Sequence, residues 1–310
     1  MKVFSQRLFG CIKLALPKSA KMCLWLFEII LPLSLLVRLL QYYGVVGYLA
    51  DFLHPFFNLV GLPGETAIVF VTSVFLPLYA AIAVMTSLVM SLRETTILTL
   101  MCLLAHNLPV ECAVTKKTGS SFIGMFILRV MMAFVVAFFL NIVLPQSDVP
   151  FMQVVVAVHD VSIISLLTAW LHTSLSLILT IVLIVTGLMV LQRILMEFNL
   201  IEVISRPLRP LMKLFGLPDN SSFLWFVGNL VGLAYGGTIM ADMVEEGKLS
   251  LEDSNMVNHH LAISHSLLED TLLFVALGIP IGIIVGTRVL FAMAVVWGRK
   301  LIVMRCIYRK

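Results

Sequence analysis

Apolar stretches long enough to cross a lipid bilayer recur along this chain, and they constrain its fold more than any motif does. A transmembrane helix needs about 20 consecutive apolar residues. Of the 310 residues, 60% are hydrophobic and 12% are charged, which is about half the charge of a typical soluble domain. The sequence therefore predicts an all-α, polytopic integral membrane protein whose main partner is the lipid bilayer. The stretches cover residues 22–43, 66–90, 121–145, 175–195, 222–244 and 274–297.

The composition and motifs disfavour several functional classes. The net charge is +4, and the basic residues lie at the chain ends and in short loops, so we expect no nucleic-acid partner. The five cysteines are odd in number and form no Cys-x-x-Cys pair, which argues against a disulfide framework or a zinc site. Walker A, Gly-x-Ser-x-Gly and His-Glu-x-x-His signatures do not occur. We therefore expect neither an enzyme nor a cofactor.

The sequence contains an internal repeat that keeps polar residues in register. Matching positions lie 155 residues apart early in the repeat and 159 apart later, and a short insertion near residues 245–248 explains the step. Chance similarity between apolar helices does not align Arg, His, Pro and acidic residues, so the chain is expected to hold two copies of one membrane unit. The pairs are Arg38 with Arg193, His54-Pro55 with Arg209-Pro210, Gly61-Leu62-Pro63 with Gly216-Leu217-Pro218, His106 with His265, Glu111 with Asp270, and Arg129 with Arg288.

The charges of the loops indicate that the two copies point in opposite directions. Loop 44–65 has no Lys or Arg, whereas its counterpart 199–218 has three. In the next polar region the contrast reverses, because the first copy is basic there and the second is acidic. Lys and Arg favour the cytoplasmic side of short loops, so the pattern predicts two inverted-topology repeats in the cell (inner) membrane, with both termini cytoplasmic. Two parallel copies are the alternative.

Inversion requires an odd number of crossings between equivalent points, which about three transmembrane helices and one re-entrant hairpin or broken helix per copy provide. The non-crossing candidates are residues 94–115 and 253–273, each interrupted by a His and an acid. Whether residues 151–172 cross the membrane is left open by the sequence. The expected divisions are a basic amphipathic N-terminal arm at 1–21, repeat 1 at 22–145, a linker or interfacial helix at 146–174, repeat 2 at 175–300 and a basic tail at 301–310.

Two polar motifs at equivalent places form the strongest candidate site. They are His106-Asn107-Leu108-Pro109-Val110-Glu111 and His265-Ser266-Leu267-Leu268-Glu269-Asp270. An ionisable group inside a membrane costs roughly 2.5–3.5 kcal/mol even on lenient scales, so a matched set indicates a function. Imidazole with carboxylate suits a proton relay or a divalent-cation site, and His106, His265 and Asp270 are the candidate metal ligands. The alternative is that these groups only hold the broken segments together.

Further polar residues are candidates for supporting roles. Arg129 and Arg288 lie within apolar helices, where balancing the nearby acids is the simpler explanation and binding an anionic substrate is the other. Asn229 lies within the glycine-rich stretch 228–238 and Asp242 follows it, and the two are candidates to face the same cavity; the alternative is that the glycines serve only close helix packing. His259-His260 has no counterpart in the first copy, and it is equally compatible with substrate discrimination and with a wet membrane surface.

The two His-containing motifs, the Gly-Leu-Pro helix starts and the two-copy layout resemble the nucleoside recognition (Gate) domain family of membrane proteins. The chain is also similar to spore maturation proteins A and B joined in one polypeptide, and to the membrane part of ferrous iron transporter B. The resemblance implies solute transport, and we expect a secondary, ion- or proton-coupled transporter for a small molecule or ion, with the site between the repeats. A divalent metal cation permease and a non-transport membrane scaffold or assembly factor are the alternatives, and a homo-oligomer is left open.

Overall fold

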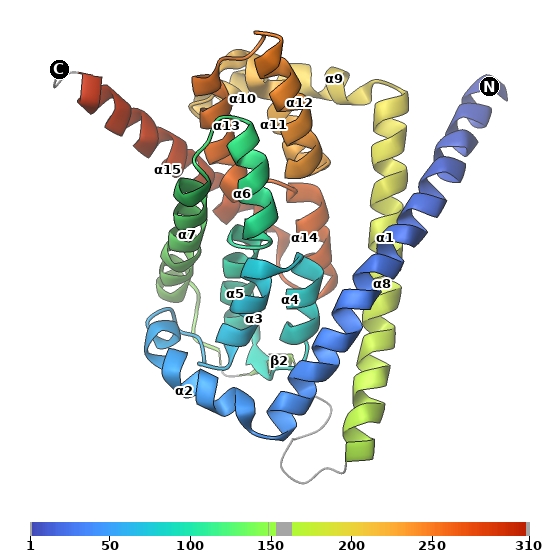
Figure 1. The fold of residues 1–310 in the computed structure, drawn as a ribbon, viewed down its shortest axis with the longest axis vertical. Helices are drawn as coiled ribbons and strands as arrows, with labels where there is room; N and C mark the ends of the chain where they lie inside the picture. The colour runs from blue at the N-terminus through green and yellow to red at the C-terminus, as the bar shows by residue number, and fades with distance from the viewer. Residues whose placement is uncertain (1, 148, 153–162, 308–310) are drawn as a thin grey trace.

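The chain is almost entirely helical, as the sequence predicts for an integral membrane protein. The computed structural model describes residues 2–147, 149–152 and 163–307 (Figure 1). Within these residues, five helical segments are long and apolar enough to cross a membrane. They are Phe4–Leu40, Leu92–Lys117, Phe122–Val143, Ile163–Glu197 and Ile281–Ile302.

Equivalent elements follow one another in the same order in the two copies. The first copy comprises α1 (Lys2–Tyr42), α2 (Val45–Asn58), α3 (Thr66–Phe75), α4 (Leu78–Met85), β1 (Met90–Ser91), α5 (Leu92–Leu104), α6 (Leu108–Lys117) and α7 (Phe122–Val143). The second comprises α8 (Ile163–Glu197), α9 (Leu200–Ser205), η1 (Arg206–Leu208), α10 (Arg209–Leu214), η2 (Asp219–Ser221), α11 (Ser222–Leu230), α12 (Leu233–Glu245), α13 (Leu251–Ser264), α14 (Leu267–Ala276) and α15 (Ile281–Ile307). A short strand, β2 (Pro150–Met152), pairs antiparallel with β1.

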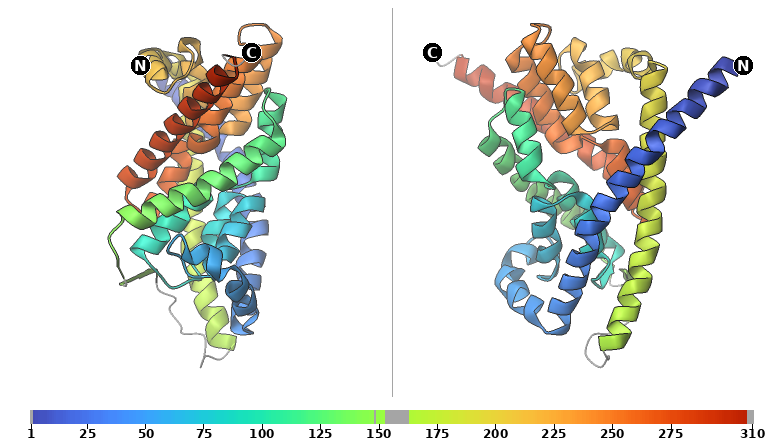
Figure 2. Two further views of the ribbon diagram at one scale, coloured as in Figure 1. Left: turned by 90° about the vertical axis from the view of Figure 1, so that its left-hand side faces the viewer. Right: turned by 45° about the vertical axis from the view of Figure 1, so that its right-hand side comes forward.

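The two longest helices, α1 and α8, pack against each other and run in opposite directions (Figures 1 and 2). As a result α2 lies at one end of the molecule, and its counterparts α9 and α10 lie at the other (Figure 1). Helix α1 is continuous from Lys2, so the expected N-terminal arm is not separated from the first span. Helix α8 begins at Ile163, inside the expected linker, while His159 and Asp160 lie outside the described residues.

The structure corrects two of the expected continuous spans. Segments 66–90 and 222–244 are not continuous, because each divides into two short helices that fold back on each other. The first divides before Pro77, which has no amide hydrogen to donate and favours extended backbone at Leu76. The second divides at Gly232, whose φ of 97° few other residues adopt.

The two segments that were predicted to be re-entrant hairpins or broken helices are broken helices. Helix α6 continues the direction of α5 as one spanning segment, Leu92–Lys117, and α14 continues beyond α13 in the same manner (Figure 1). Each copy therefore contains one broken helix, where a hairpin or a broken helix was expected, and one helical hairpin, where a continuous span was expected. The apolar length of a segment reveals that it can cross a membrane, but not whether its backbone reverses.

Local backbone geometry matches between the copies. Gly61 and Gly216 both have φ of 73°, and each lies in a turn closed by the amide of the next residue. Leu62 N donates to Phe57 O at 3.0 Å, and Leu217 N donates to Met212 O at 2.7 Å. The Gly-Leu-Pro motif of the sequence is thus the same turn, built twice.

Apolar side chains form a stripe on the outer face of α7. They recur every three or four residues, so they lie along one side of the helix. These side chains are exposed, whereas the side chains on the opposite side of α7 are buried. The stripe is therefore a lipid-facing surface. Its members are Ile123, Ile127, Met131, Val135, Phe138 and Ile142.

We expect Gly61→Ala to lower the melting temperature of the detergent-solubilised protein. An added Cβ would overlap the Asn141 side chain, and a φ of 73° disfavours any L side chain, so we expect a loss of about 1–2 kcal/mol. The control is Gly282→Ala, because Gly282 lies in helix α15 with open space around it. A Gly61→Ala variant as stable as the control would contradict this account of the turn.

Candidate functional site

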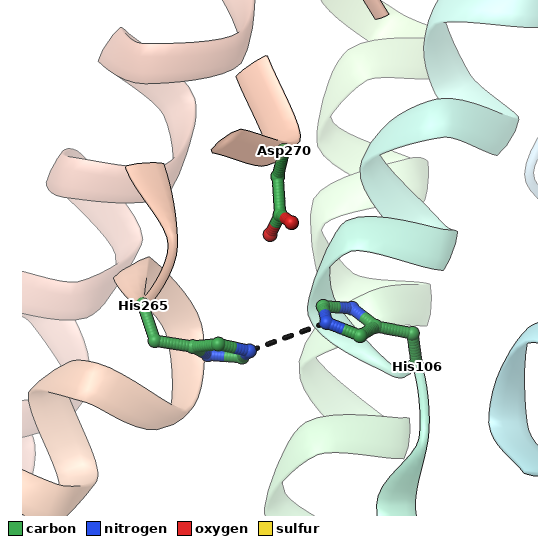
Figure 3. Close-up of side chains that lie close together, drawn as sticks. All are labelled: His106, His265 and Asp270. Atoms are coloured by element: carbon green, nitrogen blue, oxygen red, sulfur yellow. Dashed lines mark hydrogen bonds between the residues drawn. The ribbon is translucent and has the colours of Figure 1, made fainter. Parts of the chain in front are cut away.

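The breaks in the two broken helices bring His106 and His265 together near the centre of the molecule. His106 follows the end of α5, and His265 follows the end of α13. Their Nε2 atoms lie 3.3 Å apart (Figure 3), and the residues are only 6% and 1% exposed. The pair was expected from the repeat register, and the two imidazoles come from equivalent positions in different copies.

The residue after each histidine adopts a left-handed conformation. Asn107 has φ of 47° and Ser266 has φ of 53°, which is uncommon for residues other than glycine. Each is held by its backbone amide: Asn107 N donates to Ser73 O at 2.8 Å, and Ser266 N donates to Gly228 O at 3.0 Å. The acceptors belong to α3 and α11, so each hairpin fixes the break of its own copy. Such strain persists only where the surroundings enforce it, and it clusters at functional sites.

Two buried arginines support the breaks from the following helix of each copy. Arg129 Nε donates to Leu104 O at 2.7 Å, and Arg288 Nε donates to Ile263 O at 3.1 Å. These carbonyls lie at helix ends and have no partner within the helix, and the negative end of a helix favours a cation. Both arginines therefore satisfy the backbone where the helices break.

The same arginines neutralise the acids of the two motifs. Arg129 forms a close ion pair with Glu111, and Arg288 Nη2 lies 3.4 Å from Asp270 Oδ2. Both guanidinium groups are buried, with side-chain exposures of 2% and 0%. Both contacts have the geometry that charge balancing requires, and each of these two arginines has both an acid and a main-chain acceptor.

Glu111 is the centre of the cluster. Its Oε1 lies 3.2 Å from His106 Nε2, and its Oε2 lies 3.2 Å from His265 Nε2. Asp270 occupies the equivalent position in the second copy but has one methylene less, and it stays paired with Arg288. The cluster is therefore asymmetric, although the repeat places its residues in equivalent positions.

The hydrogen bonds of the imidazoles determine where their protons lie. His106 Nδ1 is 3.0 Å from Leu103 O, and His265 Nδ1 is 2.7 Å from Leu261 O. A carbonyl oxygen only accepts hydrogen bonds, so Nδ1 carries the hydrogen in both rings. In the neutral ring Nε2 is then an acceptor. Two acceptors that face each other and a carboxylate require a proton or another cation between them.

One group of side chains could also hold a metal ion. The ligand atoms of His106, His265 and Asp270 lie within 4.8 Å of one another (Figure 3). Imidazole nitrogen and carboxylate oxygen bind Zn²⁺ and other first-row divalent ions at about 2.0–2.2 Å. The donor set therefore fits such an ion, provided that the side chains move closer together.

The remaining predicted residues divide between the cluster and its surroundings. Glu269 lies beside the cluster and accepts a hydrogen bond from Tyr79 Oη at 2.7 Å. Asn229 is buried and donates from Nδ2 to Trp225 O at 2.8 Å. Asp242 is exposed on α12, so the structure does not bring it to the buried cluster. Tyr79 was not anticipated, because a tyrosine in an apolar stretch carries no charge to mark it.

The two additional histidines of the second copy belong to a separate polar layer. His259 Nδ1 lies 2.7 Å from Asn255 O, and its Nε2 lies 3.1 Å from Arg299 Nη1. His260 is fully buried and accepts a hydrogen bond from Trp225 Nε1 at 3.1 Å. Both rings are occupied by these neighbours rather than by the central cluster.

We expect Glu111→Gln to destabilise the protein strongly. The change leaves the buried Arg129 without its counter-charge, and removing one partner of a buried pair costs about 3–5 kcal/mol. The measurement is thermal unfolding in detergent. The control is Glu202→Gln, because Glu202 pairs with Arg206 on the surface, where side-chain exposure is 62%, and its loss is expected to cost less than about 1 kcal/mol. Equal stability of the two variants would show that the Glu111–Arg129 pair is not needed.

Comparison with known proteins places this architecture in a family. The family model described as "Nucleoside recognition" (Gate) matches residues 23–142, which include His106, Glu111 and Arg129. The chain is 34% identical over 275 residues to "Uncharacterized membrane protein YvoD" of Bacillus subtilis (strain 168), and the match covers 86% of this chain and 88% of that protein. No solved structure matches the chain. The chain therefore belongs to the nucleoside recognition (Gate) domain family of membrane proteins.

Proposed function

We propose that the protein is a secondary transporter for a small solute, and that the histidine–carboxylate cluster binds the coupling proton or ion. The observation that carries the proposal is the pair of facing Nε2 atoms beside Glu111. A positive charge at this point stabilises the cluster, and its release leaves two acceptors and a carboxylate in contact. The free energy of the cluster therefore depends on a movable cation, as ion coupling requires.

The arrangement of the copies supports alternating access. Helices α1 and α8 are equivalent by sequence and run antiparallel, which is what an inverted-topology repeat requires. The broken helices then approach from opposite sides and meet at the two histidines near the middle of the molecule. Transporters with inverted repeats place their sites at such breaks and move one repeat against the other.

A side-chain contact between the copies is suited to respond to this movement. Tyr79 belongs to the α3–α4 hairpin of the first copy, and Glu269 belongs to α14 of the second. Their 2.7 Å hydrogen bond must break if the hairpin and α14 separate. Because Asp270 is adjacent to Glu269, the contact connects the hairpin to the metal-compatible side of the cluster.

A divalent-cation permease is the second candidate. It is favoured by the donor set of His106, His265 and Asp270, whose ligand atoms already lie within 4.8 Å of one another. In that case the metal is the transported substrate and displaces the proton between the imidazoles. The non-transport scaffold has less support, because a scaffold does not need ionisable groups buried at this cost.

Thermal stability of the detergent-purified protein provides the first test. The probes are Zn²⁺, Mn²⁺, nucleosides and small organic acids, each applied across a range of pH. A ligand at 100 times its dissociation constant stabilises the folded state by about 2.7 kcal/mol. We expect one class of probe to raise the melting temperature, and we expect His106→Gln and His265→Gln to abolish the rise.

The matched control for this test is His172→Gln, because His172 is an exposed histidine on α8. It should respond as the wild type does. A shift caused by Zn²⁺ or Mn²⁺ and lost in Asp270→Asn favours the permease. If His106→Gln and His265→Gln keep the full response, the ligand binds elsewhere and the assignment of the site is wrong. Counterflow in liposomes with the stabilising probe then separates transport from binding alone.

Site-directed labelling tests the inverted orientation. Asp51 and Arg206 are equivalent positions, 155 residues apart, and both are exposed. In a variant whose five native cysteines are replaced, we expect Asp51→Cys to react with an impermeant maleimide in intact cells. We expect Arg206→Cys to react only after the membrane is opened, because its segment retains the cytoplasmic Lys and Arg bias. Labelling of both positions from the same side would contradict inversion.

A further inference from the structure

A second buried arginine environment lies apart from the histidine cluster. Arg38 is on α1 and is only 7% exposed, although its place near the helix end suggests a side chain that reaches the membrane surface. It lines a small polar cavity between α1, the end of α4 and α8. The polar side chains of this cavity are Ser34, Arg38, Thr86, Ser87, Trp170, Thr173 and Ser174.

Arg38 has no acidic partner among residues 2–147, 149–152 and 163–307, and it makes no hydrogen bond to any of them. The equivalent arginine of the second copy shows that the missing partner is an acid. The equivalent Arg193 lies 3.7 Å from Glu197, one helical turn later. The residue of the first copy that corresponds to Glu197 is Tyr42. The second copy therefore places an acid beside this arginine, which it shares with Arg7 of the first copy, whereas the described residues of the first copy place no acid beside Arg38.

A buried cation without a counter-charge is unfavourable, because the low dielectric of the interior no longer screens it. Arg129 and Arg288 each pair with an acid, and the buried Arg93 donates to oxygen atoms of Gly61 and Asn141, whereas Arg38 has neither kind of partner among the described residues. Water can hydrate Arg38, but it cannot neutralise the charge. A guanidinium group forms its strongest hydrogen bonds with anionic acceptors, so an anion is the group that completes this environment.

The cavity limits the size of its occupant and supplies further donors. The centre of a water-sized sphere can move through about 10 Å³ of it, so the cavity takes a single small molecule or ion and excludes a large organic anion. Trp170 Nε1 donates to Ser34 Oγ at 3.0 Å. The hydroxyl groups of Thr86 and Thr173 donate to carbonyls of their own helices, and a hydroxyl hydrogen can rotate towards an anion instead.

We propose that this cavity binds one small inorganic anion of the size of chloride, held by the Arg38 guanidinium. The wall residues Ser34 and Thr86 belong to the first copy, and Trp170 and Thr173 belong to the second. The anion therefore bridges the two copies at a place separate from the histidine cluster. The proposal is independent of the transport function, because it concerns the charge of Arg38 alone.

The test compares the melting temperature of the purified full-length protein in sodium chloride and in sodium gluconate at equal ionic strength. Gluconate is too large for the cavity. We expect chloride to raise the melting temperature of the wild type saturably, by roughly 2–4 °C. Arg38→Gln should lose the difference, whereas the matched Arg193→Gln should keep it, because Arg193 already has Glu197 beside it.

A second variant keeps the test decisive if Arg38→Gln fails to fold. Tyr42→Glu places an acid one turn after Arg38, as Glu197 is placed after Arg193. We expect this variant to be stable in gluconate and insensitive to chloride. Binding of radiolabelled chloride, at about one ion per chain in the wild type and none in Tyr42→Glu, supports the proposal. The absence of any chloride dependence in the wild type, or an unchanged dependence in Tyr42→Glu, overturns it.

Discussion

The neutralisation of buried charge is the constraint on which the rest of this structure depends. Arg129 and Arg288 are held inside an apolar bundle, and each forms an ion pair with the acid of its own copy. Each also donates to a carbonyl at the end of the preceding helix. One side chain thus compensates both the acid and the unpaired backbone of the break. Without these arginines, neither the helix breaks nor the carboxylates would be stable in the apolar interior of the bundle.

The cluster is asymmetric because the side chain of Glu111 is one methylene group longer than that of Asp270. Glu111 is long enough to reach both histidines while it stays paired with Arg129. Asp270 is shorter and remains beside Arg288, within reach of the same histidines only if the backbone or the side chains shift. In the proposed ion-coupled mechanism, the two acids therefore compete unequally for the cation between the imidazoles. For the proposed transporter, such inequality would allow two similar halves to hold the ligand differently in two states.

The sequence was sufficient to predict the membrane class and the four ionisable residues that the structure brings together, His106, Glu111, His265 and Asp270, because buried charges are rare and matching positions keep them in register. It did not distinguish hairpins from broken helices. Both kinds of segment are apolar, and the reversal at Pro77 depends on which neighbours surround the free backbone groups. Tyr79 was missed for a related reason, because its partner Glu269 lies 190 positions away in the other copy.

Comparison of the two copies distinguishes the residues that set the backbone from the residues that set the local charge. Positions that set the backbone agree: Gly61 with Gly216, and Asn107 with Ser266, share their unusual φ values. Positions that set local charge differ, as Glu111 does from Asp270 and Tyr42 from Glu197. Backbone geometry must be common to both copies if they are to form one interface, whereas charge is free to diverge once the scaffold is stable. We therefore expect the charged positions that differ between the two copies to determine the chemistry of this protein.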